Sequence, residues 1–219
     1  MRDGIQLYKQ GKYQEALTSF LNTDVKPEEH ALLSYHLGLC YARLGRYDES
    51  LLYLEQVVTS EMGFAHVYQC RLLVGYIYAE TERTRMAAWE FMRLLRDGFE
   101  SAKVHGALAH VLYLERNLME SIDQLERALK LEPDNPNALN SMGFVLAESE
   151  NRLGQALLCC QKAVKLRPES AMYLDSLGWV YHKMGRRKEA TDVLRRALLM
   201  SPNKKIIKDH LQKVVRLNA

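Results

Sequence analysis

Long apolar runs and the short motifs of enzyme active sites are both missing from this sequence. No stretch of about 18 consecutive apolar residues occurs in the 219 residues, so we expect no membrane-spanning helix. Glycine-rich phosphate loops, metal-spaced histidine and cysteine sets, and nucleophile motifs are missing too. We therefore expect no enzymatic activity, no cofactor, no metal and no small-molecule substrate.

Cysteine is scarce, with only Cys40, Cys70, Cys159 and Cys160. Cys159 and Cys160 are adjacent, which is a poor geometry for a mutual disulfide, and the spacing of the four does not suit zinc. We expect all four to be reduced packing residues in a cytoplasmic protein. The sequence starts without the apolar core of a signal peptide. A periplasmic or membrane-anchored location is the alternative if an upstream targeting segment is absent from this sequence.

Small residues recur along the chain at intervals of 34, 37, 34, 34 and 35 residues. They are Gly4, Gly38, Gly75, Ala109, Gly143 and Gly178. Sixteen residues after each one (seventeen in the fifth unit) comes a larger residue: Phe20, Leu54, Phe91, Leu125, Cys160 and Leu194. A fixed period of this length indicates stacked copies of one supersecondary unit. We expect two helix backbones to approach closely at each small residue, with the large residue filling the gap.

Glycines and prolines mark the ends of helices and divide each unit into a helix, a short turn and a second helix. Turn glycines stand at Gly11, Gly45 and Gly185, and prolines close three units at Pro133, Pro168 and Pro202. Glycine favours turns and proline cannot continue a helix. The sequence therefore predicts an all-α fold of antiparallel helix pairs.

The units resemble tetratricopeptide repeats over nearly the whole chain. The best match is Leu177-Gly178-Trp179-Val180-Tyr181, followed by Gly185 and Pro202. The third unit departs most, because Glu82 replaces the turn glycine and no proline closes it. The phrase from Tyr173 to Trp179 resembles bacterial repeat proteins in particular.

The resemblance implies a right-handed superhelical solenoid, here one domain over residues 1–204. Its expected repeats span about 1–30, 31–66, 67–101, 102–135, 136–170 and 171–204. Beyond Pro202, apolar residues recur at helical spacing between lysines, so residues 205–219 are expected to form an amphipathic helix that caps the last repeat.

In tetratricopeptide repeats the first helix of each pair lines a concave groove, which implies a binding surface here. The expected groove residues are mostly aromatic, with Asn140 and two histidines as polar groups. They are Tyr8, Tyr35, Leu39, Tyr76, His110, Tyr113, Asn140, Phe144, Trp179 and His182. Rigid aromatic rings suit peptide capture, although aromatic residues at helical spacing also occur as core. The lysine and asparagine set that clamps chaperone tails is missing, so a chaperone co-adaptor is not expected.

Two other surfaces stand out. Met86, Trp89 and Arg93 share one helix face and form an expected second interface, which could serve a partner or self-association. Residues 183–219 carry eleven Lys or Arg against three Asp or Glu, a net charge of +8. The basic patch expected there is Arg186, Arg187, Arg195, Arg196, Lys204 and Lys205.

These observations predict a non-enzymatic protein-interaction scaffold or adaptor that holds a peptide or helical segment of another protein in its groove. One alternative is a self-associating module, and hence a homo-oligomer. The other is a polyanion binder, for nucleic acid or an anionic membrane, that uses the basic C-terminal end. Few aromatic residues interleave with the basic stretch, which disfavours a stacking platform for single strands.

Overall fold

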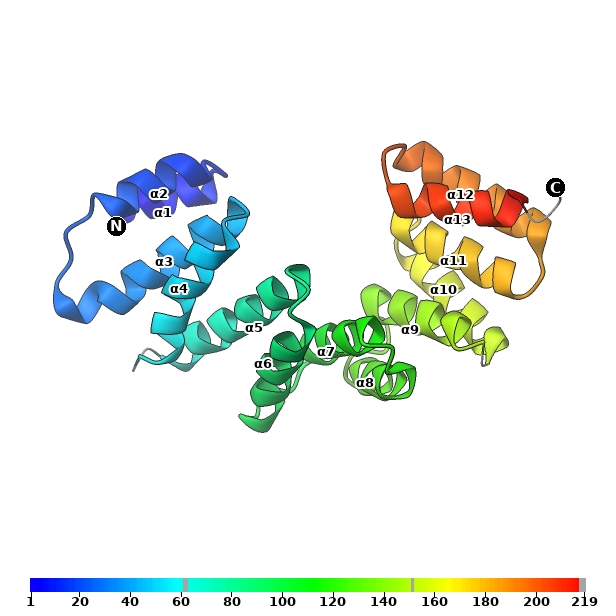
Figure 1. Cartoon of the computed structure of the whole chain (residues 1–219), viewed down its shortest axis with the longest axis horizontal. Helices are drawn as coiled ribbons and strands as arrows, with labels where there is room; N and C mark the ends of the chain where they lie inside the picture. The colour runs from blue at the N-terminus through cyan, green and yellow to red at the C-terminus, as the bar shows by residue number, and fades with distance from the viewer. Residues whose placement is uncertain (61–62, 151, 217–219) are drawn as a thin grey trace. The chain divides into compact units, whose positions relative to one another are not determined.

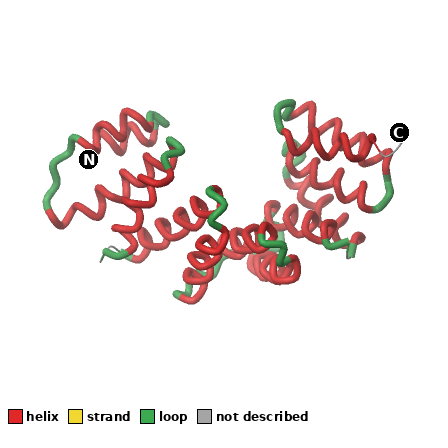
Figure 2. Tube along the Cα trace, viewed as in Figure 1, coloured by secondary structure: helices red, strands yellow, loops and turns green. Residues whose placement is uncertain are grey.

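All regular structure is helical in the residues that the computed structural model describes, which are 1–60, 63–150 and 152–216. Figure 1 labels the helices in chain order, and Figure 2 shows short loops between them. The chain divides into two compact units, residues 1–100 (unit 1) and residues 101–219 (unit 2). Each unit is a stack of antiparallel helix pairs.

Unit 1 contains three helix pairs and one short 3₁₀ helix. The first and second pairs are α1 (Arg2–Lys9) with α2 (Tyr13–Leu21), and α3 (His30–Arg43) with α4 (Tyr47–Val58). The third pair is α5 (Phe64–Glu80) with α6 (Thr84–Arg96), and the 3₁₀ helix is η1 (Pro27–Glu29). Phe20 and Leu17 of α2 pack against Leu37 and Cys40 of α3, which joins the first two pairs in one core.

Unit 2 contains three more pairs and a final single helix. The pairs are α7 (Ala102–Leu114) with α8 (Leu118–Leu131), α9 (Pro136–Glu148) with α10 (Leu153–Leu166), and α11 (Ala171–Lys183) with α12 (Arg187–Met200). The last helix is α13 (Lys205–Arg216). The predicted all-α repeat solenoid of antiparallel pairs is therefore confirmed. Its right-handed superhelical path and its continuity over 1–204 stay predictions.

The periodic glycines lie in close contact with the second helix of their own pair. A Cβ atom added to Gly4 would lie 2.6 Å from the ring of Phe20, and one added to Gly38 would lie 2.7 Å from Leu54. The same conflict recurs at Gly75 with Phe91. Real Cβ atoms do not come so close, so the large residue of each pair occupies the space that glycine leaves.

The turn inside each pair requires a left-handed backbone. Gly11, Gly45 and Gly185 have φ of +77°, +72° and +74°. Where the sequence has no glycine the conformation persists, since Glu82 and Arg116 have φ of +60° and +65°. The helical hairpin is thus kept in the third and fourth units at some cost in backbone strain.

Helix α13 covers the end of unit 2. Ile207 and Val214 are fully buried, Ile207 beside Leu174 and Ala197, and Val214 beside Leu194. The amphipathic C-terminal helix thus packs on α11 and α12 over residues 205–216. Residues 217–219 of the expected cap lie outside the described residues. No helix in the described part of the chain is both long and apolar enough to cross a membrane.

The four cysteines are free thiols. Cys40, Cys70 and Cys160 are buried and Cys159 is half-buried. Burial raises the pKa of the Cys40 thiol to about 11 and that of Cys70 to about 12. Such thiols stay protonated at neutral pH and behave as small apolar packing groups.

Candidate functional site

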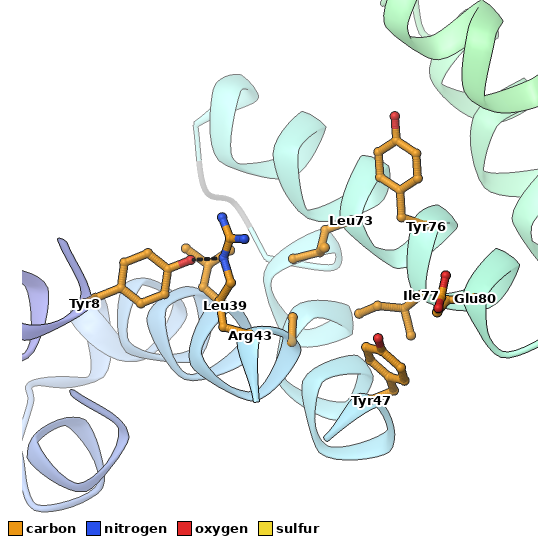
Figure 3. A pocket seen from close by; sticks show the side chains of 9 residues that line it. Tyr8, Leu39, Arg43, Tyr47, Leu73, Tyr76, Ile77 and Glu80 are labelled. Carbon is orange, nitrogen blue, oxygen red and sulfur yellow. Dashed lines mark hydrogen bonds between the residues drawn. The ribbon is translucent and has the colours of Figure 1, made fainter. Parts of the chain in front are cut away.

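Unit 1 has a cavity of about 370 Å³ on its first helices, which we call the unit-1 groove (Figure 3). It is lined by Tyr8 of α1, Leu39, Ala42 and Arg43 of α3, Tyr47 of α4, and Leu73, Tyr76, Ile77 and Glu80 of α5. Arg43 Nε donates a hydrogen bond to the hydroxyl of Tyr8 at 3.3 Å, across the α1–α3 boundary. Three predicted groove residues, Tyr8, Leu39 and Tyr76, thus line one cavity.

Tyr76 is the most accessible aromatic ring of the unit-1 groove. Its side chain is 38% exposed, and its ring meets Phe91 edge-on with centroids 5.5 Å apart. Burial of the rest of the side chain raises the pKa of Tyr76, so the phenol is protonated at neutral pH. It can therefore donate or accept a hydrogen bond beside an apolar surface.

Unit 2 has a second cavity of about 330 Å³, which we call the unit-2 groove. Its wall comes mainly from α7, α9 and α11, with Ile206 of α13 at one end. Four predicted residues line it together: His110, Tyr113, Asn140 and Phe144. The rings of Tyr113 and Phe144 meet edge-on with centroids 5.7 Å apart, which fixes both orientations.

The polar centre of the unit-2 groove is the carboxamide of Asn140. Its Oδ1 atom is buried and accepts no hydrogen bond from the described residues. A buried acceptor without a partner costs about 1–3 kcal/mol. Beside it, burial raises the pKa of Tyr113, with Glu148 adding to the shift. The groove thus has a phenol and a carboxamide on an apolar wall, and the carboxamide oxygen is buried without a partner among the described residues.

Three predicted groove residues lie outside both cavities. Tyr35 bridges α3 and α5, where its hydroxyl donates to Gln69 Oε1 at 2.6 Å. Trp179 was expected to face an open groove, but its side chain is only 6% exposed. His182 lies against Trp179, with ring centroids 5.0 Å apart, and burial is the main reason its pKa is lowered.

The prediction for Trp179 was wrong because α13 covers the ring. His210 of α13 stacks on Trp179 with centroids 4.3 Å apart, and its Nδ1 lies 3.0 Å from both carboxylate oxygens of Asp175. The indole Nε1 donates to Glu148 Oε1 at 2.7 Å. Trp179 therefore fixes the C-terminal helix and does not offer a free surface.

Sequence reasoning missed a second row of groove residues. Arg43, Glu80 and Leu114 line the cavities one helical turn after Leu39, Tyr76 and His110. The spacing of four residues along each first helix was the available signal. Met172, Asp175 and Ile206 also line the unit-2 groove. Ile206 could not be found from the repeat, because α13 follows the last repeat and has a register of its own.

The two other predicted surfaces share no residue with the linings of the two grooves. Met86, Trp89 and Arg93 lie together at a cavity between α4, α5 and α6. In the basic patch, Arg186 pairs with Glu189, and Arg187 Nη2 donates to the carbonyl of Val215. The remaining patch residues are exposed: Arg195, Arg196, Lys204 and Lys205. Polyanion binding by this patch stays a prediction.

Comparison with known proteins gives two family matches, one near each end of the chain. Models described as "Tetratricopeptide repeat" match residues 3–62 and residues 174–206. These ranges cover nearly all of the first helix pair, the whole of the second, and most of the last pair.

Curated relatives match over limited parts of their own length. A chloroplastic protein from Arabidopsis thaliana is 38% identical over 63 residues, which are 27% of this chain and 19% of that protein. Human protein O-mannosyl-transferase TMTC1 is 24% identical over 184 residues, which are 83% of this chain and 20% of that protein. The chain thus spans about a fifth of the length of these relatives.

Solved structures share the fold over most of the chain. YrrB, described as a TPR protein with an unusual peptide-binding site, superposes with a TM-score of 0.61 at 20% identity. The superposition covers 90% of this chain and 96% of YrrB. Together with the helix pairs and the glycine contacts, this shows the tetratricopeptide-repeat fold, and the two family matches show that the chain contains tetratricopeptide repeats.

Proposed function

We propose that this chain is a non-enzymatic scaffold or adaptor, and that its unit-2 groove holds an extended segment of another protein. The tetratricopeptide fold supports a protein-interaction role in general. The observation that carries the finer proposal is the buried, unmatched Oδ1 of Asn140 in a groove walled by Tyr113 and Phe144. YrrB, which shares the fold, is described as having a peptide-binding site.

The chemistry of the groove favours a peptide backbone as the ligand. An extended segment presents a backbone N–H at every residue, except proline, and one of these can donate to Asn140 Oδ1 when the carboxamide turns toward the groove. The phenol of Tyr113 can donate in turn to a backbone carbonyl. Phe144 and Met172 offer apolar surface to a neighbouring side chain. Backbone bonds would give affinity, and the apolar wall would select the side chain beside them.

A binding role also suits the groove better than group transfer. The match to TMTC1 spans a fifth of that transferase. Both grooves of this chain are lined mainly by aromatic, aliphatic and uncharged polar side chains. Such walls hold a ligand and fix its orientation.

The proposal is tested with a random dodecapeptide display library selected on the full chain, followed by fluorescence anisotropy with synthetic peptides. Phe144→Ala should weaken the selected peptides at least about tenfold, or about 1.4 kcal/mol. Met119→Ala, at an exposed site on α8, is the matched control and should leave binding unchanged. If no selected peptide loses affinity for the Phe144 variant, the unit-2 groove is not the binding site.

A further inference from the structure

A second cavity lies in unit 1 away from the groove. It measures about 550 Å³ and lies between α4, α5 and α6, which Figure 1 labels. Its lining and that of the unit-1 groove share no residue. Val58 comes from α4, Arg71 and Tyr78 from α5, and Met86 and Trp89 from α6. We call this cavity the Trp89 cleft.

Trp89 is the unusual residue of its repeat position. Fourteen residues after each small residue (fifteen in the fifth unit), the row reads Thr18, Leu52, Trp89, Asp123, Leu158 and Asp192. Trp89 is the one aromatic residue in this row, and it is 46% exposed. Met86, three residues before it, is 47% exposed. A large aromatic ring and a flexible thioether that line a cavity can pack against an apolar side chain of a ligand.

Arginines flank the ring along the same face of α6. Arg85 and Arg93 stand four residues before and four residues after Trp89, so the three side chains lie in one line on the helix. The guanidinium of Arg93 lies 5.0 Å from the ring centroid of Trp89, over its face. Arg93 also reaches Asp97, but only at 4.0 Å. Arg85 is exposed and has no ion pair among the described residues.

The two carboxylates of the Trp89 cleft are already engaged. Glu90 Oε2 lies 3.3 Å from Arg71 Nη1, and both side chains are buried. Burial raises the pKa of Glu90, while Arg71 lowers it. Glu55 accepts a hydrogen bond from the Tyr78 hydroxyl at 3.0 Å, and burial with this bond raises the pKa of Tyr78 to about 12. The positive charge of Arg85 at the rim is therefore left for a ligand, while Arg93 also lies 4.0 Å from Asp97.

From this arrangement we propose that the Trp89 cleft binds an acidic segment of a partner protein. A leucine, methionine or phenylalanine of the segment packs on Trp89 and Met86, and adjacent Asp or Glu side chains pair with Arg85 and Arg93. Arginine suits carboxylates because its planar fork can donate two parallel bonds. The site is independent of the grooves and of the proposal made for them.

Charge complementarity favours an acidic protein segment over nucleic acid. Residues 1–100 carry 11 Lys or Arg against 14 Asp or Glu, a net charge of −3, which repels a phosphate chain. A peptide with two or three carboxylates places them locally, where Arg85 and Arg93 stand. Because Arg85 is exposed and Arg93 is only half-buried, their pairs contribute more to association rate and specificity than to affinity.

The test starts from the full chain carrying Tyr76→Ala and Phe144→Ala, which disables both grooves. A random dodecapeptide display library is first incubated with a variant that also carries Trp89→Ser and Arg85→Glu, and the peptides that bind this variant are discarded. The remaining peptides are then selected on the chain that carries Tyr76→Ala and Phe144→Ala alone. We expect peptides in which Asp or Glu lies within about three residues of Leu, Met or Phe. Peptides without acidic enrichment, or no selected peptide at all, would overturn the proposal.

Synthetic fluorescein-labelled peptides then measure the contacts. Trp89→Ser and Arg85→Glu/Arg93→Glu should each weaken binding at least about tenfold. Leu52→Ser, at the same repeat position on α4 and 59% exposed, is the matched control and should change nothing. A peptide with lysine in place of its acidic residues should bind the double glutamate variant better than the wild type. Circular dichroism confirms that each variant is folded.

Two competing occupants give different results. A dimer in sedimentation velocity that dissociates on Trp89→Ser would assign the cleft to a second copy of this chain. Binding of a fluorescent 15-nucleotide oligo(dT) that is lost in the Arg85→Glu/Arg93→Glu variant would assign it to nucleic acid. Either result overturns the proposal. The groove variant isolates the cleft, so failure of the groove proposal does not affect this outcome.

Discussion

At the scale of single residues, the repeat is maintained by backbone conformation more strictly than by residue identity. The turn of the third pair keeps a left-handed residue although glycine has been replaced by Glu82. Glu82→Gly should therefore relieve strain and stabilise the protein by about 0.5–1 kcal/mol. Gly45→Ala, in the same turn of the second pair and with open space around it, should destabilise by a similar amount. Thermal melts of both variants and of the wild type measure these effects. Melting temperatures equal to that of the wild type would contradict the strain argument.

A second prediction for one residue concerns acid sensitivity. His36 stacks on Phe20 with centroids 5.1 Å apart, and burial, His66 and the N-terminus lower the pKa of His36. The unfolded chain therefore binds a proton more readily than the folded one, so the free energy of unfolding should fall as pH drops through about 6.5. Urea melts at pH 7.5 and 5.5 should show a smaller acid loss for His36→Phe than for wild type. The same reduction in a variant of exposed His30 would remove the assignment to His36.

At the scale of helices, each pair is fixed by one close contact. A Cβ atom at Gly178 would lie 2.6 Å from Leu194 Cγ, in a fully buried part of unit 2. Gly178→Ala should lower the free energy of unfolding by about 1–3 kcal/mol, because overpacking displaces α11 from α12. Leu194→Ala removes the clashing side chain, so Gly178→Ala should cost less in that background, and a double-mutant cycle by urea unfolding should show coupling. Additive effects of the two substitutions would exclude a direct clash.

At the scale of the whole molecule, two units each have an apolar core of their own. The cluster around Phe20 lies within residues 1–100, and the cluster around Leu146 lies within residues 101–219. Stability in repeat arrays comes mainly from neighbouring units. We therefore expect residues 101–219, expressed alone, to give a helical circular dichroism spectrum and a cooperative melt. A fragment without a cooperative transition would show that unit 2 needs unit 1 to fold.

The sequence predicts those parts of the structure that depend on the repeat. The helix pairs and the contacts of Gly4, Gly38, Gly75 and Gly178 follow from the period, because each depends on neighbours within one unit. Groove residues follow in part, since His110, Tyr113, Asn140 and Phe144 come together in one cavity. The sequence does not predict the burial of Trp179, because the ring is covered by His210 on a helix outside the repeat. It also does not predict the unmatched Oδ1 of Asn140, which depends on the positions of all side chains around it.

The most direct test of the account is to measure Asn140→Ala in two ways. The substitution removes a buried acceptor that has no partner among the described residues, so urea unfolding without ligand should show unchanged or higher stability. Peptides selected on the wild-type chain should nevertheless bind the variant about tenfold more weakly by fluorescence anisotropy. Weaker binding at equal or greater stability is the result we predict. Unchanged affinity, or a loss of affinity that parallels a loss of stability, would contradict the role of Asn140 in the groove.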